Sequence, residues 1–466
     1  MNALLETQVG AFAIPGLILG IAVLILLVLR TKVHALIALI IAASIAGLSA
    51  GMAPDAAIKS ITTGFGSTLS TIGLVVGFGV MMGAILEVSG AAEKLAISMI
   101  RLLGKGKEDW ALAGAGYIIS IPIFVDSAFV ILNPLVKALA RSSGRSMITL
   151  GIALAGGMVL THHAVPPTPG PLGAAGIYNV PVSDMILYGL VLVIPAFFAV
   201  TLYARIMGPR IEAMAIAQGE PIDVSEAFTE FKSMADEREK QLPSLLLSML
   251  PIILPIVLIF INTGVAAINT ANKGVLPSWV VTGSSFIGNP VIAVGLGLLA
   301  AIYGLFRSRT QHDTIATMEK GLDTAGIILL VTGAGGALGA VLRDSGVGQY
   351  IGELVAQLPL PAIMIPFLIA TMVRLVQGSG TVAIITSASL SAPILAQIPG
   401  VNMVLAAQAA ALGAMIFSYF NDSLFWVVNR MMGVKNVKLQ LLTWSVPTTI
   451  AWAACFVTVL VADVFV

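Results

Sequence analysis

The stretch "IPIFVDSAFVILNPL", residues 121–135, places one carboxylate, Asp126, in a run that otherwise resembles the interior of a membrane helix. An aspartate near the centre of a membrane helix costs roughly 2.5–3.5 kcal/mol on insertion scales, whereas a place at a helix N-terminus returns only about 0.3–1 kcal/mol. Capping alone therefore does not account for this residue, and we take it as the first indication of a functional site within the bilayer.

The composition around this stretch is that of a membrane protein. Of the 466 residues, 58% are hydrophobic and 10% are charged, whereas soluble domains carry about 25% charged residues. Long apolar stretches recur along the chain, and the short alternating strands of an outer-membrane barrel do not. The sequence therefore predicts an all-α polytopic membrane protein, with clear apolar helices at 14–29, 35–50, 186–203, 245–261, 291–306 and 445–466.

Several other classes of function are disfavoured. The 24 Lys and Arg against 23 Asp and Glu offer no basic face to nucleic acid, and Cys455 is the only cysteine, which excludes an intrachain disulfide. His162 and His163 form a weak metal pair, because no third ligand follows at helical spacing. We expect neither a metal nor a cofactor. Residues 1–10 lack Lys and Arg, so we expect the first helix to be retained rather than cleaved as a signal peptide.

Two internal echoes indicate how the chain is organised. "LVVGFGVMMGAILEVSG" (74–90) and "LLVTGAGGALGAVLRDSG" (329–346) align at an offset of 256, and "GGMVLT" (156–161) matches "GAMIFS" (413–418) at an offset of 257. Small residues at intervals of four also permit close helix packing, but the shared offset favours a duplicated unit. We predict two repeats, inverted relative to each other, at 1–207 and 245–466, with a polar cytoplasmic linker at 208–244.

Each predicted repeat contains two breaks in its apolar pattern. A hairpin tip at 122–127 corresponds to one at 377–381, and a broken helix at 161–171 corresponds to one at 418–423. Irregular backbone at membrane depth is tolerated only where it is buried in protein or lines a watery cavity, so the first pair is interpreted as the tips of re-entrant hairpins. Four breaks in two corresponding pairs predict a secondary transporter with its binding site between the repeats.

Polar residues at these breaks are the candidates for substrate binding. Hydroxyls and free backbone N–H groups at half-helix N-termini form a ready anion site, and plain N-capping is the alternative. Arg374 could receive a carboxylate in bidentate fashion, or it could snorkel or pair with a neighbour. The candidates are Ser127, Thr161, His163, Thr168, Arg374, Ser379, Gly380, Thr381 and Asn421.

Three residues are candidates for proton coupling: Asp126, Asp422 and His162. A carboxylate facing an anionic substrate would repel it unless protonated, so Asp126 could bind a proton and a substrate anion together. A salt bridge to another residue is the alternative for Asp126, and Asp422 could instead cap the helix that follows it. His162 and His163 are adjacent and point in different directions, so we expect at most one of them to face the site.

With these motifs the chain resembles, over nearly its whole length, the gluconate permease (GntP) family of bacterial inner-membrane symporters. The resemblance implies proton-coupled uptake of gluconate or a related small hydroxy-carboxylate across the inner membrane. It also implies an elevator-like movement of the two repeats through the bilayer and a homodimer. The stretches that carry it are "GFGVMMGAILEVSGAAEKLA", "IFVDSAFVILNPL", "THHAVPPTPGP", "RLVQGSGTVAIITSASLSAP" and "FNDSLFWVVNRMMG".

Three positions depart from the family pattern. The acidic residue of the first tip is usually Glu and here is Asp126, "PPHPGP" becomes "PPTPGP" with Thr168, and "GSATVA" becomes "GSGTVA" with Gly380. A shorter acid and a lost imidazole change the size and polarity of the pocket. Glycerate, another sugar acid, a hydroxybutyrate-like acid and a small amino acid such as serine therefore stand beside gluconate as possible substrates.

Two other functions are compatible with parts of the sequence. Sodium-coupled carboxylate symport or cation/proton antiport would use the same paired breaks. A membrane-embedded hydrolase would use Asp126, His162 and His163, but no Gly-x-Ser-x-Gly, Cys/His or metalloprotease pattern is present, and the paired breaks would be unexplained. We therefore predict a transporter and not an enzyme.

Overall fold

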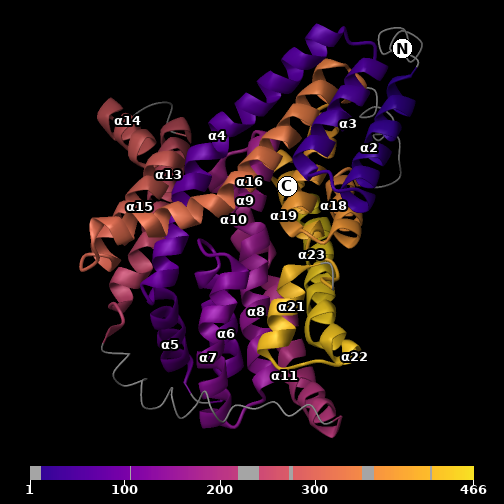
Figure 1. Ribbon diagram of the computed structural model, residues 1–466. Helices are drawn as coiled ribbons and strands as arrows, with labels where there is room; N and C mark the ends of the chain where they lie inside the picture. Colours follow the sequence, from indigo (N-terminus) through magenta and orange to yellow (C-terminus); the bar gives the residue numbers. More distant parts are fainter. Residues whose placement is uncertain are drawn as a thin grey trace.

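The structure is a computed structural model that describes residues 12–104, 106–218, 241–271, 276–348, 361–419 and 422–465. Within these ranges the chain is helical and contains no strand, as its composition predicts (Figure 1). By length and composition, four of the described helices could cross a membrane, or up to six if each of two bent helix pairs forms one span.

The six apolar segments that the sequence predicts are all helical. Their bounds shift by a few residues at most sites, and the segment at 186–203 is divided by Val193 into two helices. The helices are α2 (Ala13–Arg30), α3 (Ala35–Ser49), α10 (Val182–Leu192) with α11 (Ile194–Ala217), α13 (Leu245–Ala271), α15 (Pro290–Leu305) and α23 (Val446–Phe465). Shorter elements between them are α5 (Ala91–Leu103), α14 (Ser278–Ile287), α22 (Val437–Gln440) and the π-helical turn η1 (Leu441–Ser445).

Two long helices, α4 (Pro54–Val88) and α16 (Gln311–Asp344), pack against each other across the upper part of the molecule in Figure 1. Their C-terminal ends are 256 positions apart, which is the offset of the aligned glycine-rich stretches. Gly64 allows the close crossing, because a Cβ at this position would lie 2.6 Å from the carbonyl oxygen of Gly336.

Four helix breaks lie in a bundle that packs beside these long helices, two in each half of the chain. All four coincide with the predicted breaks, with shifts at their edges. The paired helices are α6 (Glu108–Ile119) and α7 (Val125–Ser143), α8 (Met147–Ala164) and α9 (Pro169–Tyr178), α18 (Met364–Gln377) and α19 (Gly380–Leu395), and α20 (Met403–Gly413) and α21 (Ser423–Met431).

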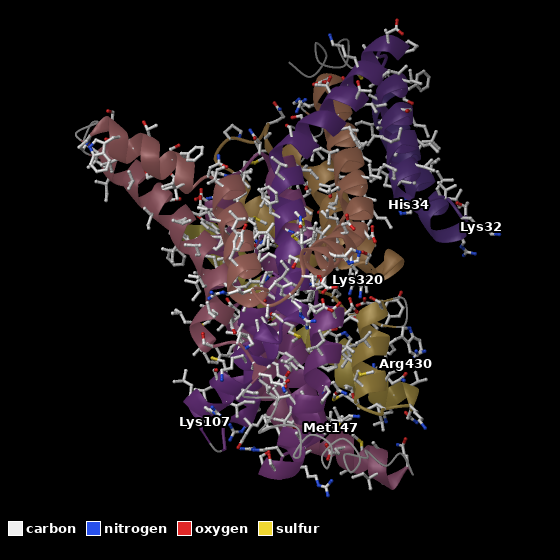
Figure 2. All side chains as sticks on the ribbon, turned by 60° about the vertical axis from the view of Figure 1, so that its left-hand side comes forward. Lys32, His34, Lys107, Met147, Lys320 and Arg430 are labelled. Atoms are coloured by element: carbon white, nitrogen blue, oxygen red, sulfur yellow. The ribbon has the colours of Figure 1, made fainter. Side chains whose placement is uncertain are left out.

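The first hairpin enters and leaves at the same end of the bundle. Lys107 precedes α6 and Met147 begins α8, and Figure 2 shows both at the lower end of the molecule, so α7 returns to the end where α6 begins. The turn begins two residues earlier than predicted, at Ser120. It closes at the extended Phe124, which places Asp126 in the first turn of α7.

The other breaks follow from residues that interrupt helices. Gly378 adopts a φ of 86° and ends α18, so the second tip consists of this glycine and the capping residue Ser379. Two prolines lie in the break at 165–168. The last break begins at Ala414, earlier than predicted, and contains Phe417 with a φ of 23°, a conformation that is strained for a residue with a side chain.

The predicted linker begins as a helix. α11 continues to Ala217, and Glu212 accepts hydrogen bonds from the Ser146 hydroxyl at 2.5 Å and from the backbone N–H of Ile148 at 3.2 Å. A carboxylate at this position caps α8, since the first N–H groups of a helix lack partners within it. The start of the linker is therefore fixed to the bundle, and residues 219–240 lie outside the described ranges.

The two halves of the chain meet inside the bundle, where α9 of the first half packs against α19 of the second. The hydroxyls of Tyr178 and Ser391 lie 2.5 Å apart, near the C-terminal ends of these helices. Both helices begin at a break, so their N-termini are free to face a shared site while their other ends are held together.

Candidate functional site

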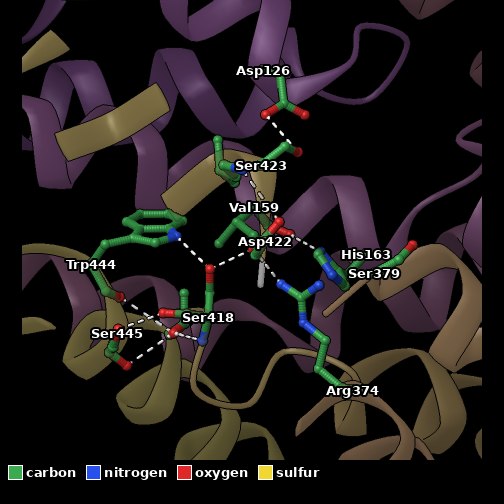
Figure 3. Close-up of polar contacts among 12 residues, drawn as sticks. Asp126, Val159, His163, Arg374, Ser379, Ser418, Asp422, Ser423, Trp444 and Ser445 are labelled. Atoms are coloured by element: carbon green, nitrogen blue, oxygen red, sulfur yellow. Dashed lines mark hydrogen bonds and ion pairs between the residues drawn. The ribbon is translucent and has the colours of Figure 1, made fainter. Parts of the chain in front are cut away.

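A buried ion pair occupies the centre of the site. Nη2 of Arg374, in the last turn of α18, donates to Oδ2 of Asp422 at 2.5 Å (Figure 3). Arg374 is 5% exposed and Asp422 is 9% exposed. Asp422 also caps α21, because its Oδ1 accepts from the backbone N–H of Leu424 at 3.2 Å. The pair joins the second hairpin to the second broken helix.

A chain of hydrogen bonds supports Asp422 from behind. Nε1 of Trp444, a fully buried residue, donates to the Ser418 hydroxyl at 2.9 Å, and this hydroxyl donates to Oδ2 of Asp422. The Ser445 hydroxyl donates to the carbonyl of Ser418, and the backbone N–H of Ser418 donates to the Thr448 hydroxyl at 3.0 Å. These contacts fix the irregular backbone before Asp422 (Figure 3).

Asp126 reaches the same site from the first half of the chain. The hydroxyl of Ser423, the residue after Asp422, donates to Oδ1 of Asp126 at 3.3 Å. Among the described residues Asp126 forms no ion pair, so the salt bridge that was the alternative role for Asp126 is not found there. The carboxylate is half-buried, and it lies across from the Arg374–Asp422 pair rather than within it.

The rings of the two adjacent histidines are in edge contact, with centroids 5.7 Å apart, and they have different further neighbours. The His162 ring packs against Phe124 of the first tip, with ring centroids 5.9 Å apart. His163 is 6% exposed, and its ring faces Gly380, the first residue of α19. A Cβ at position 380 would overlap Nε2 of His163, so a glycine is required for this approach between the two halves.

Several predicted ligands serve the breaks themselves. The Ser379 hydroxyl accepts from the backbone N–H of Val382 at 3.4 Å and so caps α19. The Thr168 hydroxyl lies 2.7 Å from the carbonyl of Val165 and 2.9 Å from that of His162, which stabilises the turn before α9.

The remaining predicted ligands differ in their surroundings. The Thr161 hydroxyl is fully buried and donates to its own helix, at 3.4 Å from the carbonyl of Met158. Ser127 and Thr381 are half-buried in the first turns of α7 and α19. Asn421 lies outside the described residues. The structure thus brings together Asp126, His163, Arg374, Ser379, Gly380 and Asp422, whereas Thr161 and Thr168 have local partners.

Four residues at this site did not figure among the candidates: Ser418, Ser423, Trp444 and Ser445. Ser418 and Ser423 lie at the edges of the predicted break, so only their roles were missed. Trp444 and Ser445 belong to the π-helical turn, a feature that often marks functional sites. The local sequence does not predict this π-helical turn. Its contacts with Ser418 join residues that are 26 and 27 positions apart in the sequence.

A cavity of about 540 Å³ lies at the opposite ends of α9 and α19. It is lined by Thr68, Tyr178, Asn179, Arg343 and Pro393, among others. The cavity lies at the C-terminal ends of these helices, whereas the ion pair lies near the start of α19. The cavity is therefore distinct from the candidate site. Among the described residues no three His, Cys, Asp or Glu side chains are grouped as metal ligands.

Comparison with known proteins identifies the family. The profile of GntP family permeases matches residues 12–465. An uncharacterized permease of Haemophilus influenzae is 55% identical over 457 residues, which span 97% of this chain and 92% of that relative. A gluconate permease of Pseudomonas aeruginosa is 34% identical over 443 residues, spanning 94% of this chain and 95% of its own length.

A solved structure agrees with the fold. MtrF of Neisseria gonorrhoeae, described with a class of antimetabolite efflux pumps, superposes with a TM-score of 0.63 over 93% of this chain and 96% of its own, at 17% identity. At this identity the similarity concerns the architecture alone. The chain belongs to the GntP family of permeases and is a multi-pass transporter of the inner membrane, not an enzyme.

Proposed function

We propose that this protein carries gluconate or a related small hydroxy-carboxylate across the inner membrane together with protons. One observation supports it above the others: a single guanidinium, Arg374, is already paired with Asp422, while Asp126 stands near them without an ion pair. The relative named gluconate permease supports the class of substrate.

The charge balance of the site gives the reason for proton coupling. With Asp126 and Asp422 ionised, Arg374 leaves one net negative charge, and a bound monocarboxylate would add a second. At an effective dielectric constant of 20, two like charges 4 Å apart repel by about 4 kcal/mol. A proton that enters with the anion removes this penalty, so anion and proton bind more favourably together than apart.

The same site offers donors to a carboxylate. Nε of Arg374 is buried without a hydrogen-bond partner among the described residues. The N-terminus of α19 lies beside it and carries the partial positive charge of a helix start. A carboxylate that bridges these groups would leave the hydroxyls of the substrate for Ser127 and Thr381, which are half-buried at the helix starts.

The broader architecture fits a carrier that moves its site. We include in the proposal that residues 1–207 and 245–466 are inverted repeats joined by a cytoplasmic linker at 208–244. In this scheme the bundle slides as a unit against the long helices α4 and α16, in a homodimer. Since the polar groups of the site come from bundle helices, such a movement would not break their contacts.

Uptake of radiolabelled gluconate by reconstituted liposomes tests the coupling. A pH gradient, alkaline inside and without sodium, is expected to drive accumulation that a protonophore abolishes. A sodium gradient at equal pH is expected to drive none. Accumulation that follows the sodium gradient alone would reject proton coupling, and failure of gluconate to exchange in either condition would reject the substrate.

A further inference from the structure

Asp422 is surrounded by hydrogen-bond donors. Arg374 and the backbone N–H of Leu424 can only donate. The Ser418 hydroxyl also donates to Asp422, while its oxygen accepts from Nε1 of Trp444. Oδ2 thus accepts from two donors and Oδ1 from one, so the carboxylate is engaged as the ion-pair partner of Arg374.

The tautomer of His163 follows from a similar count. Its Nδ1 lies 3.0 Å from the carbonyl oxygen of Val159, one turn back on α8. A carbonyl oxygen accepts only, so Nδ1 carries the hydrogen and the neutral ring presents a bare lone pair at Nε2. Nε2 is buried and has no hydrogen-bond partner among the described residues. The one unsatisfied proton acceptor of this ring therefore faces the start of α19.

Charged and titratable groups surround this nitrogen from several elements. Arg374 on α18 and His162 on α8 act on His163, whereas Asp422, at the start of α21, acts on His162 and on Asp126 of α7. His162 faces Phe124 of the first tip, whereas Nε2 of His163 faces Gly380 beside the unpartnered Nε of Arg374. Nδ1 of His162 is also buried without a hydrogen-bond partner among the described residues, but only His163 has a tautomer fixed by a carbonyl and a lone pair directed at the start of α19.

We infer that Nε2 of His163 is the atom that binds the transported proton, while Asp422 remains an ionised partner of Arg374. This assignment rests on the proton-coupled function proposed above. A hydronium ion transfers its proton to the Nε2 lone pair and leaves as water, and no bond of the substrate changes. The new N–H then becomes a second donor beside Nε of Arg374.

This arrangement couples the two ligands obligatorily. Burial disfavours an imidazolium on its own, and the bare lone pair of neutral His163 repels a carboxylate. Each ligand removes the obstacle to the other, so one proton is taken up with each anion. By linkage, the Kd for the anion rises about tenfold for each pH unit over the range in which free His163 is neutral.

The test measures gluconate binding and proton uptake by the purified protein in weakly buffered solution with a pH indicator. In the wild type we expect one proton to be taken up per gluconate bound, and the tenfold rise in Kd per pH unit. His163→Gln places an amide N–H₂ near the position of Nε2 but cannot take a proton. We expect this variant to bind weakly, with a Kd independent of pH and no proton uptake.

His162→Gln is the matched comparison, since it makes the same change one residue away. It is expected to keep one proton per gluconate and the wild-type slope. Loss of the slope in His162→Gln with retention in His163→Gln would overturn the assignment, as would retention in both. A wild type that binds gluconate without any proton would instead reject proton coupling itself. If His163→Gln fails to fold, Gly380→Ala replaces it in the test, because a Cβ at position 380 displaces the His163 ring. Gly380→Ala is expected to reduce the change of log Kd with pH, and an unchanged pH dependence would overturn the assignment.

Discussion

Nη2 of Arg374 and Oδ2 of Asp422 lie 2.5 Å apart, although the two residues are 48 positions apart in the sequence and belong to different helix breaks. Each break exposes backbone that a continuous helix would satisfy. The ion pair closes the hairpin tip against the broken helix and concentrates charge where that backbone is irregular. The stability of the site and its affinity for an anion therefore depend on the same pair.

Removal of one partner of this pair should destabilise the protein strongly. Arg374→Gln or Asp422→Asn leaves a buried charge uncompensated, which typically costs about 3–5 kcal/mol. The double variant removes both charges and should recover much of the unfolding temperature in detergent while gluconate transport stays absent. A double variant as unstable as the single ones would show that the pair does not act as a unit.

Neutralisation of Asp126 should uncouple transport from the proton. Asp126→Asn removes one negative charge, which lowers the repulsion that makes the proton on His163 necessary, so an anion can bind without that proton, and exchange of gluconate across the membrane should persist. Accumulation driven by a pH gradient should be lost, measured as uptake into liposomes. Asp184→Asn, in the first turn of α10 and away from the breaks, serves as the control. Full accumulation by Asp126→Asn would remove Asp126 from the coupling.

The cap at Ser379 can be separated from a binding role by comparison with a cap elsewhere. Ser379→Ala and Asn402→Ala each remove the side chain that accepts from the start of a helix, α19 or α20. Each should cost about 0.5–2 kcal/mol. Only Ser379→Ala should raise the KM for gluconate, because only α19 begins at the site. Equal KM values for the two variants would leave Ser379 a cap alone.

Close packing between α6 and α8 should make one glycine irreplaceable. A Cβ at Gly157 would lie 2.9 Å from the carbonyl carbon of Ala113 and closer to its oxygen, so Gly157→Ala should destabilise by about 1–3 kcal/mol. Gly66 on α4 has no neighbour within 4 Å of its Cβ position, and Gly66→Ala should stabilise by about 0.5–1 kcal/mol. Unfolding midpoints in detergent provide the comparison, and a Gly157→Ala protein as stable as the wild type would contradict the packing.

The fold could be predicted largely because breaks in a membrane helix have strong local signals. Prolines in the break at 165–168, Gly378 with its positive φ, and an isolated Asp126 in an apolar run all act within a few residues. The bounds were less accurate where the signal was weak. Nothing in the sequence around Ala414 indicates that the helix ends there, and the extension of α11 depends on a carboxylate that caps another helix.

The assembly of the site was harder to predict, because it depends on contacts distant in the sequence. Asp126 and Ser423 are 297 positions apart, and the approach of His163 to Gly380 links the two halves. The roles of Ser418 and Trp444 follow from a hydrogen-bond chain through a π-helical turn, for which no residue pattern is known. Residue types identified the candidates, but only the three-dimensional arrangement shows that Asp422 already accepts from three donors.

The hydroxyl pair of Tyr178 and Ser391 has a mechanical consequence. The hydrogen bond joins the C-terminal ends of α9 and α19, one helix from each half of the chain. A mechanism in which the two halves rock apart must break this hydrogen bond in every transport cycle. A mechanism in which the whole bundle moves as one rigid body keeps the bond throughout. A covalent bridge between positions 178 and 391 would therefore stop a rocking carrier and leave a sliding one at work.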